Sequence, residues 1–211
     1  MNKIERTVQL TDFFVARGNT YTLLANLFLG QFEEVKRSLA SVSLEKIGEI
    51  DDLVLLINDL KEAPLDELKV QHDNLFVVPA SFFVPPFSAH HLSFRDEEEE
   101  EEYFHKINHY YRTFGFSVPF ERFERVDHIG YLLAFTAYVN EATLALIEEG
   151  DEENFKQSMH FQRAFLNHHV QSWIGTLEKE VSLKLNRGLL LNAVRYLHQF
   201  IEWDHNELAE M

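Results

Sequence analysis

Histidine and glutamate residues near the end of the chain have a spacing that suits metal binding. His198, Glu202 and His205 follow one another at intervals of four and three residues, so on a helix they share one face. Imidazoles and carboxylates in this arrangement can hold iron, manganese or zinc, and Glu202 with His205 forms a Glu-x-x-His pair. A dimetal centre also needs a second such pair and two glutamates from neighbouring helices. The spacing alone favours a polar helix face, with a helical metal-dependent enzyme as the alternative.

Asp127 and His128 form a second group with chemical potential, directly before a strongly apolar segment. A carboxylate can orient a neighbouring imidazole as a general base, but no serine or cysteine nucleophile stands near this pair. An aspartate before a helix also accepts hydrogen bonds from the free N–H groups of the first turn. We therefore predict that Asp127 caps the helix that follows.

Composition and charge exclude several classes of function. The chain has no cysteine, which removes thiol nucleophiles, Cys-ligated zinc, iron–sulfur clusters and disulfides. Its net charge of −16 repels the phosphates of nucleic acid. The N-terminus lacks the apolar region of a signal peptide, and the apolar stretch 129–139 is shorter than the roughly 20 residues of a membrane span. We expect a soluble cytoplasmic protein that binds no nucleic acid and does not insert stably into a membrane.

The elements that carry these residues are predicted to be helices. Only 8 glycines and 5 prolines occur, and apolar residues recur at intervals of three and four. This pattern predicts an all-α, compact bundle of about nine to eleven helices in a single domain, 1–211, with halves at about 1–114 and 127–211 and a hinge at 115–126. The helices with the clearest apolar spacing are expected at about 10–28, 35–39, 47–63, 64–76, 96–114, 127–149, 152–179 and 183–207.

The stretch 77–91 is the exception to the helical pattern. It contains Pro79, Pro85 and Pro86 together with three phenylalanines, and proline prevents a regular helix. We predict an extended apolar segment, which is either a functional loop or a crossover that covers the core. Seven acidic residues, 96–102, follow it, and they predict a solvated helix start because acidic side chains favour the first turn.

Three ordered segments, taken together, resemble the TorD/DmsD family of redox-enzyme maturation chaperones, which includes the NarJ-type proteins. The first segment is similar to the family's LF-x-x-P stretch and Pro-Pro-aromatic loop, and here reads Leu75-Phe76-Val77-Val78-Pro79 and Val84-Pro85-Pro86-Phe87-Ser88. The second resembles the family's hinge and Asp-His helix start: Phe114-Gly115-Phe116, Asp127-His128-Ile129-Gly130, Phe135 and Glu141. The third pairs Phe165-Leu166 with His169 and Trp173. The chain departs from the family at Val126, His72 and Ala80, where proline and two aromatic residues are usual.

This resemblance implies a non-catalytic chaperone without cofactor or metal. Such a protein binds the twin-arginine signal peptide and the body of a molybdenum-cofactor oxidoreductase precursor, and prevents premature Tat export. It is a monomer or a domain-swapped homodimer. A general protein-interaction adaptor is the remaining alternative.

A receptor for a basic and apolar peptide needs apolar anchors beside negative charge. A carboxylate such as that of Asp127 can accept two hydrogen bonds from an arginine, and the net charge of −16 attracts the peptide from a distance. The predicted signal-peptide-binding residues are Leu75, Phe76, Phe82, Phe83, Pro85, Pro86, Phe87, Ser88, Asp127, His128 and His72.

Overall fold

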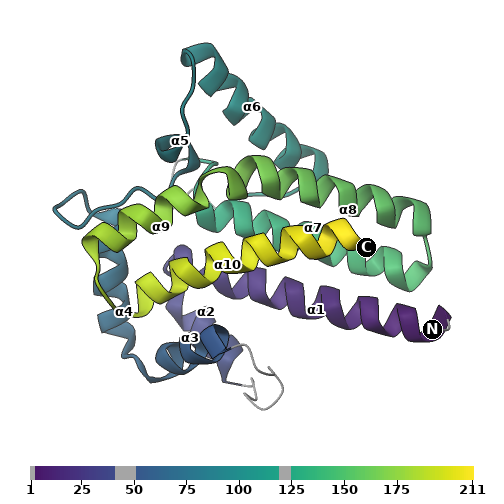
Figure 1. The fold of residues 1–211 in the computed structure, drawn as a ribbon, viewed down its shortest axis with the longest axis horizontal. Coiled ribbons are helices and arrows are strands. Elements are labelled where there is room, and N and C mark those ends of the chain that lie inside the picture. Colours follow the sequence, from purple (N-terminus) through teal and green to yellow (C-terminus); the bar gives the residue numbers. More distant parts are fainter. Residues whose placement is uncertain (1–2, 41–50, 119–124) are drawn as a thin grey trace.

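The computed structural model describes residues 3–40, 51–118 and 125–211, and these residues form a bundle of helices without a β-strand (Figure 1). The ten α-helices confirm the all-α prediction. They are α1 (Lys3–Phe28), α2 (Phe32–Leu39), α3 (Asp51–Glu62), α4 (Leu65–His72), α5 (Ser88–His91), α6 (Glu97–Phe114), α7 (Ile129–Glu149), α8 (Glu152–Leu166), α9 (Ser172–Lys184) and α10 (Leu189–Glu210). Two π-helical segments, η2 (Asp73–Val77) and η3 (Asn167–Gln171), follow α4 and α8.

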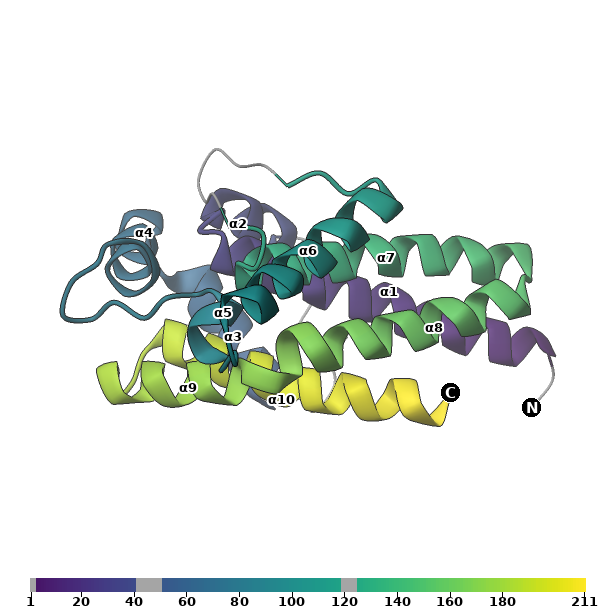
Figure 2. The ribbon, with the colours of Figure 1, turned by 90° about the horizontal axis from the view of Figure 1, so that it is seen from above.

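The long helices α1, α7, α8 and α10 run lengthwise and pack against one another, whereas α2, α3 and α4 gather at one end (Figures 1 and 2). Helix α6 stands out from one side of this bundle: its C-terminal end meets the bundle, and its first turn projects from it, with α5 below that turn (Figure 1). The two chain ends lie near the opposite end from α4 (Figure 2).

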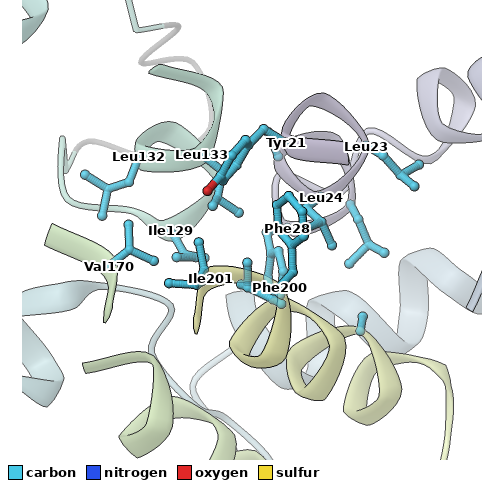
Figure 3. Packing of buried hydrophobic residues seen from close by; sticks show 14 of the residues in the cluster. Tyr21, Leu23, Leu24, Phe28, Ile129, Leu132, Leu133, Val170, Phe200 and Ile201 are labelled. Carbon is cyan, nitrogen blue, oxygen red and sulfur yellow. The ribbon is translucent and has the colours of Figure 1, made fainter. Parts of the chain in front are cut away.

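Helix α7 is the central helix, as its apolar sequence predicts. Its buried side chains include Ile129 and Leu133, which lie towards α1 and α10 in the core, and Leu132, which lies on the side of Val170 (Figure 3). Gly130 allows α7 to start close to α1, because a Cβ atom there would lie 2.6 Å from Leu29 Cγ and 3.2 Å from the Ala25 carbonyl oxygen. In the described part of the chain, α7 alone is long and apolar enough to cross a membrane, contrary to our estimate from 129–139, and 56% of its apolar window is buried in the bundle.

A polar network crosses the otherwise apolar core, and the sequence pattern did not predict it. Arg17 of α1 donates from Nε (2.6 Å) and Nη2 (2.9 Å) to the carboxylate of Asp204 on α10, and both side chains are fully buried. The same guanidinium donates to the side-chain oxygens of Asn140 on α7 and Gln162 on α8. The Tyr21 hydroxyl donates to Asp204 over 2.6 Å. Four helices are thus joined through one arginine.

Several predicted boundaries differ from the observed ones. Ser88–His91 is helical although it was expected to be extended. Its first two backbone N–H groups are satisfied by Asp127, because Ser88 donates to the Asp127 carbonyl and Ala89 to the Asp127 carboxylate. The break before the last helix was expected at 180–182 but lies at 185–188. Gly188 in this break adopts a positive φ of 123°. The expected helix start at 47–50 and the hinge residues 119–124 lie outside the described residues.

Candidate functional site

The proline-rich loop between η2 and α5 is fastened at its base and exposed at its tip. The backbone N–H of Val84 donates to the Leu75 carbonyl (2.7 Å), and Lys184 of α9 donates from Nζ to the Ser81 carbonyl (2.8 Å). Between these attachments the Phe82 side chain is 52% exposed. A large aromatic side chain is therefore held in solvent on an anchored loop.

The far end of this loop pairs with the residues that precede α7. Phe87 and His128 form an isolated antiparallel bridge, in which the Ile129 N–H donates to the Pro86 carbonyl (2.9 Å) and the Ser88 N–H to the Asp127 carbonyl (3.2 Å). This pairing, which we call the seam, joins two segments some forty residues apart in the chain. The loop and the Asp-His pair, which the sequence marked separately, are thus in direct contact.

The Asp127 carboxylate lies at the centre of the seam and is fully buried. Its Oδ2 accepts hydrogen bonds from Ser88 Oγ (3.2 Å) and the Ala89 N–H (2.9 Å), and Tyr103 Oη donates to the same Ser88 hydroxyl (2.7 Å). Burial raises the pKa of Tyr103, so its hydroxyl keeps its proton for this bond. The carboxylate therefore fixes α5 and α6 against the start of α7.

The prediction that Asp127 caps α7 is wrong. The N-cap is His128, whose Nδ1 accepts a hydrogen bond from the Gly130 N–H (3.1 Å). The seam holds His128 in an extended conformation, φ −62° and ψ 133°, which is the backbone geometry of a cap residue, and turns the preceding carboxylate towards α5.

Arg125, which the sequence reasoning did not single out, also binds Asp127. Its Nε lies 3.0 Å from Oδ1 and its Nη2 2.9 Å from Oδ2, a two-point contact. Its guanidinium carbon lies 4.8 Å from the ring centroid of Phe87 and 5.3 Å from that of Phe104 on α6. The only sequence signal for this contact is the short spacing between an arginine and an aspartate.

The other predicted site residues divide by burial. His72 is a core histidine: its Nε2 lies 3.0 Å from the Phe28 carbonyl oxygen, and its ring packs against Phe32 and Phe76. Those that are buried are His72, Leu75, Phe76, Pro86, Ser88, Asp127 and His128; Phe83, Pro85 and Phe87 are partly buried, and Phe82 is exposed. The buried members therefore support the loop and the seam from within.

Two further histidines line the same region. His91 stacks on Trp173 with ring centroids 5.2 Å apart, and its Nε2 donates to the Pro85 carbonyl (2.8 Å). His169 packs against Tyr103 of α6, and burial lowers its pKa to about 4. The preceding histidines, His90 and His168, are exposed. Trp173 Nε1 donates a hydrogen bond to the His169 carbonyl (2.6 Å).

The histidines of α10 do not form a metal centre with the described residues. His198 Nδ1 is bound to Glu178 Oε2 (2.7 Å), and its Nε2 lies 3.5 Å from Glu202. A second Glu-x-x-His pair, Glu102 with His105, lies on the exposed surface of α6. Across the described ranges, no three histidine or acidic side chains come together as possible metal ligands.

Negative charge is concentrated at the start of α6. Asp96 caps this helix by accepting from the Glu99 N–H (2.9 Å), and its first turn carries four glutamates. Tyr103 and Phe104, which contact the seam, follow on the same helix. The acidic helix start predicted from the sequence therefore belongs to the helix that contacts the seam, and it lies at the end of α6 that projects from the bundle (Figure 1).

Comparison with known families gives a match that covers the region described above. A family model described as the nitrate reductase delta subunit matches residues 27–178, well over half of the chain, and the match includes the loop, α6 and the seam. No curated protein matches the chain.

Proposed function

Because the chain belongs to the nitrate reductase delta subunit family, a family of molybdoenzyme maturation chaperones, we propose that it binds the twin-arginine signal peptide of a molybdoenzyme precursor. It acts in the cytoplasm without catalysis. It holds the precursor back from Tat export until the molybdenum cofactor has been inserted.

The seam is the observation that supports this proposal best. It joins an anchored apolar loop to a buried carboxylate, and α6, whose Tyr103 donates to Ser88 beside that carboxylate, begins with four glutamates. A twin-arginine peptide combines a basic segment with an apolar one. The apolar segment suits the exposed Phe82 and the partly buried Phe83 and Phe87, and the basic segment suits the acidic start of α6.

Charge also favours this partner. The net charge of −16 attracts a basic peptide and raises its association rate, an effect that salt screens beyond about 8 Å at physiological ionic strength. We therefore expect the association rate to fall as salt is added, while the apolar contacts continue to contribute to the affinity.

Titration calorimetry with a twin-arginine peptide and its Lys-Lys variant tests the proposal. We expect binding of the first and weaker binding of the second, because lysine cannot make a two-point contact with a carboxylate. Phe82→Ala should weaken binding about tenfold, as is typical of an exposed aromatic anchor. Leu55→Ala on α3 is the matched control, because Leu55 is 58% exposed and lies on another element.

The absence of binding heat with every twin-arginine peptide would overturn the proposal. A stable partner unrelated to exported enzymes, recovered from the native cell, would instead favour a general adaptor. The choice between a monomer and a homodimer that exchanges halves at 115–126 stays a prediction, which sedimentation of the purified chain tests.

A further inference from the structure

We propose that Asp127, Phe87 and Phe104 form a guanidinium-binding cage, that Arg125 occupies this cage in the free protein, and that an arginine of the client peptide displaces it. The inference rests on the proposed function for its ligand. The cage itself is defined by contacts within the chain.

The cage provides the two kinds of contact that select a guanidinium. The Asp127 carboxylate binds Arg125 through both oxygens, at 3.0 and 2.9 Å, and this geometry matches the planar fork of an arginine. The rings of Phe87 and Phe104 contribute cation–π contacts at 4.8 and 5.3 Å. An ammonium group lacks both the fork and the flat face, so the cage favours arginine over lysine.

The cage keeps its shape when its occupant leaves. Ser88 Oγ and the Ala89 N–H hold Asp127 Oδ2, and Tyr103 donates to the same Ser88 hydroxyl. None of these bonds involves Arg125. The carboxylate is therefore positioned for a second guanidinium by groups that remain in place.

Exposure indicates how the exchange takes place. The Asp127 side chain is fully buried, whereas the Arg125 side chain that contacts it is 43% exposed. Arg125 thus lies between the carboxylate and solvent, and an incoming guanidinium reaches the cage from the side that Arg125 occupies. Because an unpaired buried carboxylate is unfavourable, replacement by another cation is favoured over simple departure of Arg125.

Self-occupation lowers the apparent affinity for the client. For a peptide that needs an empty cage, the apparent dissociation constant equals the dissociation constant for the open cage divided by the fraction of molecules in which the cage is open. If Arg125 fills the cage in nine molecules of ten, its removal strengthens binding about tenfold. Arg125 then acts as an internal competitor, and it leaves the cage only when a peptide with a suitable arginine takes its place.

The first test is chemical rescue of Arg125→Ala, read as the thermal midpoint of unfolding. We expect methylguanidinium at ten times its dissociation constant to raise the midpoint of this variant by about 4 °C. Methylammonium at equal ionic strength should have no such effect. Methylguanidinium should raise the midpoint of the wild type by only about 1 °C, because Arg125 competes for the cage. The control Arg187→Ala, which changes an exposed arginine between α9 and α10, should respond as the wild type does. Equal responses to the two ions would overturn the cage.

If Arg125→Ala does not fold, Arg125→Lys supplies a second test. The variant keeps the positive charge but cannot bind both carboxylate oxygens. We expect methylguanidinium, and not methylammonium, to stabilise it. No difference between the two ions would overturn the cage here as well.

The second test is calorimetry with the twin-arginine peptide and its Lys-Lys variant. Arg125→Ala should bind the Arg-Arg peptide about tenfold more tightly than the wild type does, with little change for the Lys-Lys peptide. Unchanged affinity of Arg125→Ala for an Arg-Arg peptide that the wild type binds would overturn the displacement while leaving the proposed function intact. Selective methylguanidinium rescue without binding of any peptide would support the cage and overturn the proposed function.

Discussion

The change Asp204→Asn tests the buried network that joins α1, α7, α8 and α10. Asparagine keeps the size of the side chain but removes the charge, and it offers one oxygen where Asp204 accepts two bonds from Arg17 and one from Tyr21. Burial lowers the pKa of Arg17, but Asp204 and Tyr21 together raise it above its usual value in the wild type. Arginine is not deprotonated in proteins, so the guanidinium stays charged when Asp204 is removed. The variant therefore holds an unpaired cation in the core.

Breaking a buried ion pair on one side costs about 3–5 kcal/mol. For a chain of this size each kcal/mol lowers the thermal midpoint by roughly 2–4 °C, so we expect a loss of about 6–20 °C. Replacing both partners by apolar residues should recover part of this loss, since no charge is then left unpaired. Recovery stays incomplete, because Asn140 and Gln162 lose the guanidinium to which they are bound.

Thermal unfolding followed by circular dichroism measures these effects. Glu33→Gln is the matched control, because it breaks the pair between Glu33 and Lys69, in which the side chains are 54% and 42% exposed. We expect no measurable shift for the control. A shift for Asp204→Asn no larger than that of Glu33→Gln would refute the reasoning that this network stabilises the bundle.

Three further predictions concern the seam and its surroundings. Gly130→Ala should destabilise the chain by about 2 kcal/mol in urea unfolding, because the new Cβ meets Leu29 and overpacks the contact; an unchanged midpoint would contradict the close approach of α1 and α7. Phe76→Ala should cost about 3–5 kcal/mol, because Phe76 is 1% exposed, whereas Phe82→Ala should leave stability nearly unchanged. The pKa of His169 is lowered to about 4 from about 6.5. The stability that the neutral, buried imidazole gives to the folded chain is therefore fully present above pH 6.5 and is lost as the pH falls towards 4. His169→Gln should remove up to about 3 kcal/mol of that pH dependence, and His168→Gln, at an exposed position, should leave it in place.

The prediction for Phe76 changes how a binding experiment is designed. The sequence suggested Phe76 as a peptide anchor, whereas the structure packs its ring against Phe28 and His72. Loss of binding in Phe76→Ala would therefore report a damaged fold. Phe82, on the exposed tip of the loop, separates binding from stability.

The sequence by itself determined the helices and the exceptional loop. Apolar spacing and the low content of glycine and proline predicted the all-α bundle and the central α7. Three prolines marked the loop before α5, and the acidic run marked the start of α6. These features depend on residues within one or two turns of each other, so a local pattern is enough to predict them.

Only the tertiary structure decided which polar groups meet. Arg17 and Asp204 are 187 residues apart, and no periodicity links them. Asp127 and Arg125 are neighbours in sequence, yet the rings and the hydroxyl that complete their site come from the loop, α5 and α6. The buried state of Asp127 and the choice of His128 as the cap of α7 follow from the seam. Contacts of this kind depend on how elements distant in the chain pack, and short-range spacing carries no information about that packing.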